Sequence, residues 1–343
     1  MKGVSFLIPL HGADGSLRET VEALLRQEAP DSMEVLLVDD GKNEAVRGLL
    51  EAFEGYEGVR LIPGEGRGAA AAINRGLDAA RFSFLAQIDQ DVLPQPGWLE
   101  ALLDLIVEER CAAVQGVYVT DRRSPMLSCM EAADLGLRWA TLKGHESDHV
   151  CTGNTLYRTE ALRAVGGLDE NFGYGYDNDL SYRLREAGWT LKISQAARSS
   201  HRRQDSLASA LFRQYGLGMG RLDLVAKYPG KWLGDRVSGP GMILQLPMTA
   251  AVILSTLLWI LLPTAGARWR LPGTLPLILS ALLLGDRALF ALRAFRRSRD
   301  PAAFLLLPFH LLRNLAWLAA LFSWSIRSLF RIPSRPWHSM TRR

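Results

Sequence analysis

The sequence predicts an α/β domain with a mostly parallel β-sheet and flanking helices, followed by C-terminal membrane helices. Over the first 120 residues, short apolar runs alternate with stretches of helical periodicity, which is typical of parallel α/β sheets. Charged side chains directly follow three of these runs. Much later, residues 242–262 carry no charge, and 21 residues are enough to cross a bilayer as a helix.

Five strands are expected in the first part of the chain, over residues 4–10, 34–38, 59–62, 82–88 and 112–119. Leucine, valine and alanine recur at helical spacing between them, which predicts helices such as 69–80 and 98–107. The next hundred residues alternate less regularly. There we expect a partly helical segment over 121–150, short strands over 153–157 and 189–194, and helices over 177–187 and 205–227.

Charge is distributed unevenly along the chain. The net charge is +4. From Gly241 onward there are 13 arginines and 2 acidic residues, so the tail carries +11 and the first 240 residues carry −7. This pattern indicates a soluble domain on a membrane anchor. The basic excess lies among apolar stretches, which argues against nucleic acid as a partner.

The cysteines and the N-terminus indicate the compartment. Cys111, Cys129 and Cys151 are widely spaced and form no metal-ligand pair, so we expect free thiols in a reducing environment. The first residues lack a signal-peptide pattern. The front domain is therefore expected in the cytoplasm, attached to the cytoplasmic (inner) cell membrane.

The C-terminal region contains three apolar segments, at about 242–262, 271–292 and 302–324. The first is expected to be a transmembrane helix. The second contains Asp286 and Arg287, and the third contains His310, Arg313 and Asn314. Charges at mid-membrane are costly. The second and third segments therefore either span the membrane with their polar faces against protein or lie along the interface.

The strongest chemical signal is Asp89-Gln90-Asp91, at the end of the apolar run 82–88. Residues i and i+2 of a strand share a face and lie roughly 6–7 Å apart, so the two carboxylates repel unless a cation lies beside them. Mg²⁺ or Mn²⁺ carrying a diphosphate fits, because both ions take oxygen ligands. The alternative is an acidic turn, favoured by Pro94 and Pro96.

Other charged residues fall at the same edge of the predicted sheet. Asp39 and Asp40 follow the second strand and Arg67 follows the third. Ligands of open α/β sheets bind beyond the carboxyl ends of the strands, so these residues are expected near Asp89 and Asp91. The alternatives are an ordinary turn for the aspartates and a solvated loop arginine.

Taken together, these motifs resemble glycosyltransferase family 2, whose members have the GT-A fold. The resemblance covers about 1–230, with a nucleotide-sugar half over about 1–120 and an acceptor half over 121–230; residues 231–343 would be membrane-associated. The tail is similar to that of membrane-anchored members that build lipid-linked or exported polysaccharides. The matching segments are Val4–Pro9, Val38–Gly41, Arg67–Gly76, Asp89–Asp91, Gly153–Thr155, Gly166–Glu170 and Asp177–Leu180.

The resemblance implies an inverting, metal-dependent transfer of a sugar from a nucleotide-diphosphate donor to a lipid-linked saccharide or polyprenyl-phosphate acceptor. Asp177 would be the general base and Asp91 and His201 the ligands of Mg²⁺ or Mn²⁺. The donor-side residues would be Pro9, Asp39, Asp40, Arg67, Asp89 and Asp91, and the acceptor-side residues Gly153, Asn154, Asp179 and Arg213.

Several of these residues have a second interpretation. Asp177 can be a helix N-cap, and as a base at a helix start it would be ionised but weak. Asp179 can be the better cap, and His201 can be structural. Four arginines could meet a lipid phosphate or lie on anionic headgroups, namely Arg202, Arg203, Arg213 and Arg221.

The chain also departs from the family pattern. Tyr176 stands where an acidic residue is expected, and His11-Gly12 replaces the usual pair after Pro9. The Gln-x-x-Arg-Trp motif of processive synthases is absent, and Arg213–Gly216 stands near its place. This argues against a processive polymerase.

Two other functions remain as alternatives. A nucleotidyltransferase that makes a nucleotide sugar would carry a glycine-rich loop after the first strand, but residues 11–15 lack the glycine density and the basic residue. A catalytically inactive membrane scaffold with the same fold is suggested by Tyr176 alone.

Overall fold

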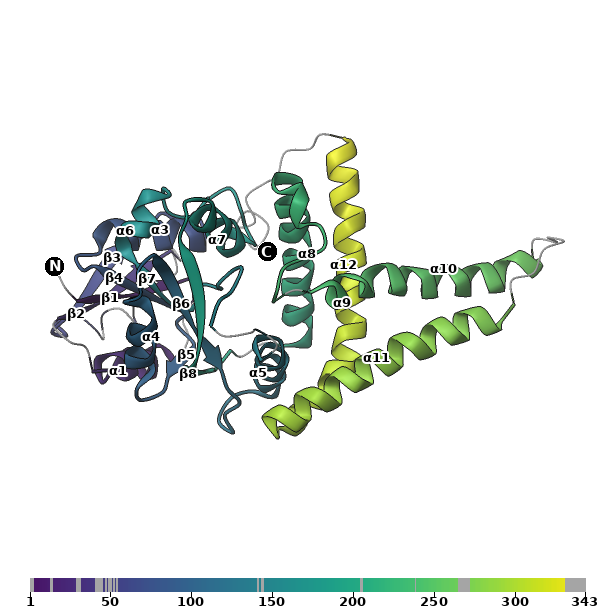
Figure 1. Ribbon diagram of the computed structural model, residues 1–343, viewed down its shortest axis with the longest axis horizontal. Coiled ribbons are helices and arrows are strands. Elements are labelled where there is room, and N and C mark those ends of the chain that lie inside the picture. Colours follow the sequence, from purple (N-terminus) through teal and green to yellow (C-terminus); the bar gives the residue numbers. More distant parts are fainter. Residues whose placement is uncertain are drawn as a thin grey trace.

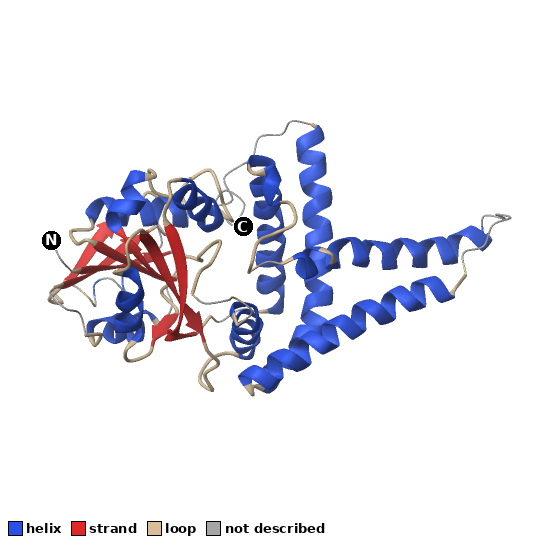
Figure 2. Ribbon diagram, viewed as in Figure 1, coloured by secondary structure: helices blue, strands red, loops and turns tan. Residues whose placement is uncertain are grey.

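The computed structural model describes residues 3–12, 15–28, 32–40, 46, 48, 51, 53, 55–140, 142, 145–203, 206–237, 239–264 and 272–330. One eight-stranded sheet forms the centre of the front domain (Figures 1 and 2). Its strands are β1 (Val4–Leu10), β2 (Met33–Asp39), β3 (Val59–Pro63), β4 (Phe84–Ile88), β5 (Val92–Pro94), β6 (Cys111–Tyr118), β7 (Asn154–Arg158) and β8 (Thr190–His201).

Helices flank the sheet and make up the C-terminal part of the chain. In the front domain they are α1 (Leu17–Leu25), α3 (Ala69–Ala79), α4 (Trp98–Ile106), α5 (Met126–Trp139), α6 (Thr159–Ala164) and α7 (Tyr176–Glu186). They continue with α8 (Leu207–Lys227), α9 (Pro240–Ile243), α10 (Gln245–Thr264), α11 (Thr274–Ser298) and α12 (Leu306–Leu329), with short 3-10 turns at Pro229–Lys231 and Pro301–Leu305. The helix expected before Phe53 lies mostly outside the described residues.

The strand order is β3-β2-β1-β4-β7-β6-β8-β5. The first four strands in this order are parallel, as expected for β-strands joined through helices. β7 then runs antiparallel to both β4 and β6. The short strand β5 pairs antiparallel with the end of β8. The sheet is therefore mixed. Neither β5 nor the extension of β8 to His201 was expected from the sequence.

The sheet separates two apolar cores. Alternate residues of β1 point to opposite faces, so Phe6 and Ile8 belong to one core and Leu7 to the other. Helices α1 and α4 cover the first face and α3, α6 and α7 the second (Figure 1). The carboxyl ends of the parallel strands are therefore held by two packed layers.

The C-terminal helices form a second structural unit. α8 and α12 lie side by side, and α10 and α11 project away from them as a helical hairpin (Figure 1). A third apolar cluster joins this unit to α5 of the front domain, through Met130, Ala210, Ala294 and Phe309. Three helical segments are long and apolar enough to cross a membrane, Gly241–Leu262, Thr274–Ser298 and Pro301–Leu329, at the positions that the sequence predicted.

Candidate active site

A cluster of polar side chains lies where β4, β5 and β8 meet. Asp89 and Asp91 lie between β4 and β5, and the pairing of β5 with β8 sets Val92 opposite His201. The backbone N–H of Arg202 donates to the carbonyl oxygen of Asp91 at 2.7 Å. This strand register brings His201 to the two aspartates across 110 positions of sequence.

The cluster has a geometry that suits a divalent metal. His201 Nε2 lies 3.0 Å from Asp91 Oδ1. One ligand atom from each of Asp89, Asp91 and His201 lies within 4.8 Å of the others. The ring of Tyr118 stacks on the His201 ring, with centroids 5.1 Å apart, and holds its orientation. Two carboxylates and an imidazole are a donor set that Mn²⁺ or Mg²⁺ accepts, so the residues present fit the expected ion.

The two carboxylates of the cluster differ in proton affinity. Burial alone would raise the pKa of Asp91, but the hydrogen bond with His201 and the charge of Arg203 lower this pKa to about 2. Burial and the neighbouring charge of Asp91 raise the pKa of Asp89. Asp91 is therefore the more firmly ionised carboxylate, as a metal ligand must be.

Arg203 borders the same cluster. Its Nη2 lies 3.1 Å from His201 Nε2 and 4.0 Å from Asp89 Oδ2, and its Nε lies 3.5 Å from Asp91 Oδ2. The guanidinium thus partly balances the two carboxylates. Sequence reasoning left Arg203 either at a lipid phosphate or on anionic headgroups. The structure places it beside Asp89 and Asp91 instead, because β8 runs on as far as His201.

Gly153 and Asn154 lie on the donor side of the sheet. The N–H of Gly153 donates to Gln87, whose own amide donates to Asp89 Oδ1 at 3.1 Å. A Cβ on Gly153 would lie 2.5 Å from Asp89 Oδ2, and its φ of +92° is one that side chains disfavour. Asn154 is buried and accepts a hydrogen bond from Trp98 Nε1 at 2.7 Å. Both residues therefore shape the support of Asp89.

The ends of β1, β2 and β3 lie next to one another, as the sequence predicted. Pro9 is paired with Val38, and Asp39 is the last residue of β2. Asp40 is buried and accepts hydrogen bonds from the backbone N–H groups of Gly68 at 2.7 Å and Arg67 at 3.1 Å. Asp40 thus supports the loop after β3.

The side chain of Arg67 makes ion pairs with Glu65 at 2.8 Å and Glu170 at 3.0 Å. Glu170 also accepts from Asn74 Nδ2 at 2.9 Å. These contacts hold Arg67 at the junction between the β3 loop and the segment after α6. The Arg67 side chain is more than half exposed.

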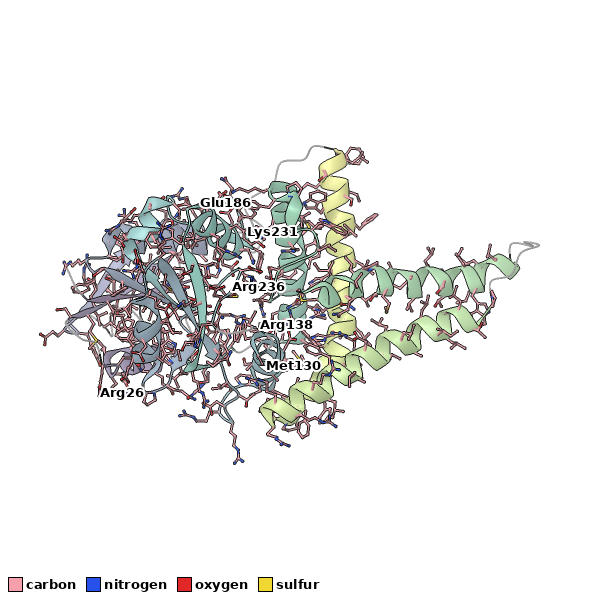
Figure 3. The ribbon with its side chains drawn as sticks, in the orientation of Figure 1. Arg26, Met130, Arg138, Glu186, Lys231 and Arg236 are labelled. Atoms are coloured by element: carbon pink, nitrogen blue, oxygen red, sulfur yellow. The ribbon has the colours of Figure 1, made fainter. Side chains whose placement is uncertain are left out.

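Asp177 lies in the first turn of α7, after Gly175 in the left-handed conformation. It lines a cavity of about 470 Å³ enclosed by the front domain and the C-terminal helices. Most of the lining is apolar, from Met130, Leu217, Leu246, Phe309, Leu321 and other side chains of α5, α8, α10 and α12. Met130 and Arg138, labelled in Figure 3, mark the α5 side of this cavity beside α8.

Burial raises the pKa of Asp177. The charge of His149 opposes this effect and the charge of Asp89 adds to it. The helix-start argument predicted a weak, easily ionised base. In the structure the desolvation of the carboxylate exceeds the stabilisation at the helix terminus, so the pKa of Asp177 lies above its usual range.

Asp179 is fully buried and fixes the position of α7. Its carboxylate pairs with Arg183 at 2.8 Å and with Lys227 at 2.6 Å, and it accepts from the Tyr228 hydroxyl at 2.9 Å. These contacts tie α7 to the end of α8. Neither Asp179 nor Asn154 is among the described residues that line the cavity, so the structure does not bring these two expected acceptor-side residues to it.

His149 is a site residue that sequence reasoning missed. With Cys151 it lines the cavity beside Asp177. Its Nδ1 lies 3.1 Å from Asp235 Oδ2, and both side chains are buried. Ser181 joins this segment to α7, because its Oγ accepts from Val150 N at 3.1 Å and donates to the Asp177 carbonyl at 2.8 Å. No sequence spacing links positions 149 and 235, so only folding reveals the pair.

The remaining arginines separate into two groups. Arg213 and Arg221 line the cavity, and Arg213 pairs with Glu131 of α5 at 3.0 Å. Arg202 lies outside the cavity lining and pairs with Glu19 at 3.3 Å and Asp121 at 3.6 Å. Of the predicted acceptor-side residues, Arg213 is the one that reaches the cavity.

Comparison with known proteins agrees with this geometry. The model of the family described as Glycosyl transferase family 2 matches residues 5–166. A "Pre-mycofactocin glycosyltransferase" from Mycobacterium tuberculosis is 29% identical over 264 residues, covering 75% of this chain and 54% of that protein. The succinoglycan biosynthesis protein ExoA from Rhizobium meliloti is 23% identical over 261 residues, covering 72% of this chain and 75% of that protein. The chain thus spans about half the length of the mycobacterial relative.

A solved structure shares the fold. A mannosyltransferase from Pyrobaculum calidifontis, determined in complex with GDP-Man and Mn²⁺, superimposes with a TM-score of 0.63 at 17% sequence identity and covers 97% of this chain and 89% of that one. The front part of the chain is therefore a family 2 glycosyltransferase domain with the GT-A fold, and three apolar helices follow it.

Proposed function

We propose that this chain transfers a sugar from a nucleotide-diphosphate donor to a lipid-linked acceptor, with inversion at the anomeric carbon, in glycan or exopolysaccharide assembly. One observation carries the proposal. Asp177 lines an apolar cavity beside the C-terminal helices, and it is also near enough to Asp89 for that charge to raise its pKa. A single carboxylate in the wall of an apolar cavity is thus also influenced by the charge of Asp89, which belongs to the Asp89–Asp91–His201 cluster.

The donor side would bind the nucleotide sugar through the strand ends. Pro9, Asp39, Asp40 and the β3 loop with Arg67 form the proposed nucleoside end. Asp91 and His201 would hold the metal, with Asp89 as a further ligand or a contact to the donor sugar. When bound, Mg²⁺ or Mn²⁺ would balance the negative charge of the leaving diphosphate, as Arg203 beside the same carboxylates can do in part.

The acceptor side is suited to an amphiphile. The cavity wall is mostly apolar, yet Arg138, Arg213, Arg221 and Arg313 also reach it. An isoprenoid or acyl chain would contact the apolar part, and a phosphate or a sugar hydroxyl would find cationic donors at the same wall. This combination favours a lipid-linked acceptor over a free sugar.

The chemical step would be a direct displacement. The acceptor hydroxyl attacks the anomeric carbon while the bond from that carbon to the diphosphate oxygen breaks, and the hydroxyl proton passes to the Asp177 carboxylate. A base with a raised pKa accepts this proton more readily near neutral pH. Ser181 and the buried His149–Asp235 pair hold the backbone and surroundings of Asp177 during the step.

We further propose that the catalytic domain lies on the cytoplasmic side of the inner membrane. The basic cluster after the second apolar helix, at 293–299, favours this side under the positive-inside rule.

A donor screen tests the proposal. Purified protein in detergent would receive UDP-, GDP- or dTDP-sugars with Mn²⁺ or Mg²⁺, and then EDTA, in the presence of a lipid extract. We expect metal-dependent release of nucleoside diphosphate from one donor. Release of pyrophosphate from a nucleoside triphosphate and a sugar phosphate would instead indicate a nucleotidyltransferase. No nucleotide binding at all would support an inactive scaffold.

A further inference from the structure

The three apolar C-terminal helices do not share one direction. α10 and α11 pack along each other and extend away from the front domain, whereas α12 runs across their base beside α8 (Figure 1). The 20 residues of α10 measure roughly 30 Å, which equals a hydrocarbon core. If the α10–α11 hairpin crosses a membrane, a helix that lies across its base must run close to the membrane plane.

Contacts in the second half of α12 hold it against α8. Ala320 lies so close to α8 that a Cβ on Gly218 would be 2.9 Å away. Towards the end of α12, Trp324 Nε1 donates to Asp223 at 2.8 Å and Arg327 pairs with the same carboxylate. α8 carries four charged side chains over its 21 residues, so a helix held along it in this way is poorly placed to cross a bilayer.

The polar residues in the first half of α12, His310, Arg313 and Asn314, would be costly in a lone spanning helix and are all buried against protein. Arg313 Nη2 donates to Gln245 Oε1 at 2.7 Å, and Asn314 Nδ2 donates to Thr249 Oγ1 at 3.0 Å. Both partners lie in the first turns of α10. α12 therefore crosses the hairpin at the end that is nearer to the front domain.

The opposite side of α12 is an apolar stripe. Its exposed residues are spaced alternately four and three apart and form one face, as expected for an amphipathic helix. Phe322 and Leu329 are 69% and 77% exposed. The stripe is Pro308, Leu312, Leu315, Ala319, Phe322, Ile326 and Leu329.

Arginine positions give independent support from the sequence. If α12 is a third span, the five arginines from Arg327 onward join Arg268 and Arg270 on the side opposite the front domain. That side then has seven arginines, and the front-domain side has the four at 293–299. If only α10 and α11 span, nine arginines lie on the front-domain side and two on the other. The second distribution agrees with the positive-inside rule for a cytoplasmic front domain.

We propose that α10 and α11 form the only two spans among the described residues, and that α12 lies in the plane of the membrane with its apolar stripe in the lipid of the leaflet next to the front domain. Such a helix is bound by the acyl–headgroup boundary of a bilayer. Residues 327–330 then lie on the same side of the membrane as residue 107.

Cysteine labelling in spheroplasts of an expression host tests this topology with the full chain. The variants are Leu329→Cys, Val107→Cys in the front domain and Pro272→Cys between α10 and α11, labelled with a membrane-impermeant maleimide and located by peptide mass. We expect Pro272→Cys alone to react in intact spheroplasts, and the other two only after permeabilisation. Leu329→Cys reacting together with Pro272→Cys would overturn the proposal, as would all three positions reacting from one side.

A depth measurement separates the two orientations of α12 even if Leu329 is shielded by headgroups. A fluorophore would be attached at Leu312→Cys, Phe322→Cys or Leu329→Cys in lipid nanodiscs, and quenched by lipids spin-labelled at different acyl positions. These sites span 17 residues, roughly 25 Å along the helix. Equal depths are expected for an in-plane helix, and depths that change steadily from the first site to the last would overturn the proposal.

Discussion

The two sides of Asp177 are built in different ways. The proposed donor side is a compact group of polar atoms, in which His201 Nε2 lies 3.0 Å from Asp91 and 3.1 Å from Arg203. The proposed acceptor side is a cavity of about 470 Å³ with a mostly apolar wall. The donor group is held by strand pairing, whereas the cavity is enclosed by helices from both structural units. A change on the donor side should thus alter charge balance and metal affinity, and a change on the acceptor side should alter shape and affinity for apolar ligands.

The largest expected effect is at the residue shared by both sides. Asp177→Asn removes the proposed base, and a general base contributes about 10²–10⁴-fold to turnover. We expect loss of nucleoside diphosphate release in this range, with nucleotide affinity unchanged by calorimetry.

Asp169→Asn is the matched control, because that carboxylate pairs with Lys227 at 3.0 Å and lies outside the cavity lining. Its turnover should stay close to that of the unchanged protein. Retention of most activity in Asp177→Asn would remove Asp177 from the role of base.

A second large effect is expected in the donor cluster alone. Asp91→Ala removes the more firmly ionised carboxylate. Loss of an outer-shell partner of a metal already lowers metal affinity about 10–100-fold. The Mn²⁺ concentration needed for half-maximal nucleotide binding should therefore rise by more than this factor. Asp121→Asn serves as the control, because Asp121 lies 3.6 Å from Arg202 but is not part of the Asp89–Asp91–His201 cluster. Equal metal dependence in both variants would contradict the metal site.

A smaller effect is expected in the apolar wall. Leu222→Asn replaces a cavity-lining side chain of α8, and burying a leucine is worth about 1.5–3 kcal/mol. The KM for a lipid acceptor should rise about tenfold or more, with donor KM and metal dependence unchanged. Leu207→Asn, on the same helix but exposed and away from the cavity, should leave both KM values unchanged. A donor KM that rises with the acceptor KM would show that the two sides are not separate.

The smallest expected effect is on the pH profile. Asp177 acts when deprotonated, so kcat falls as the pH drops through its pKa, and burial places this acid limb above the ordinary aspartate range. Charged His149 lowers that pKa, while Asp89 raises it. The double change His149→Asn with Asp235→Asn removes a buried pair without leaving either charge alone. It should move the acid limb to higher pH. A shift to lower pH would contradict the assigned charge of His149.

Much of the donor side was predictable because each motif directly follows an apolar strand. The placement of Asp39, Asp40 and Arg67 at adjacent strand ends depends only on the parallel order of β1, β2 and β3, which alternating strands and helices already indicate. The clustering of Asp89 and Asp91 with His201 is now visible in the structure. Their roles as ligands stay a prediction.

The acceptor side was less predictable because its contacts join segments without shared sequence signals. Asn154 and Asp179 stood in family-like motifs, yet one bonds to Trp98 inside the core and the other ties α7 to Lys227 and Tyr228. The His149–Asp235 pair links a loop before β7 to the segment that leads into the membrane helices. Its formation depends on how α8 and the following turn return to the front domain.

The sequence by itself determined the α/β fold, the polar strand ends and the existence of three apolar helices, because periodicity and composition are local properties of the chain. Tertiary structure alone decided which charges face one another, that burial raises the pKa of Asp177, and that α12 crosses the α10–α11 hairpin. These outcomes depend on packing between distant segments. Desolvation of a carboxylate and the direction of a helix are set by neighbours that no short stretch of sequence contains.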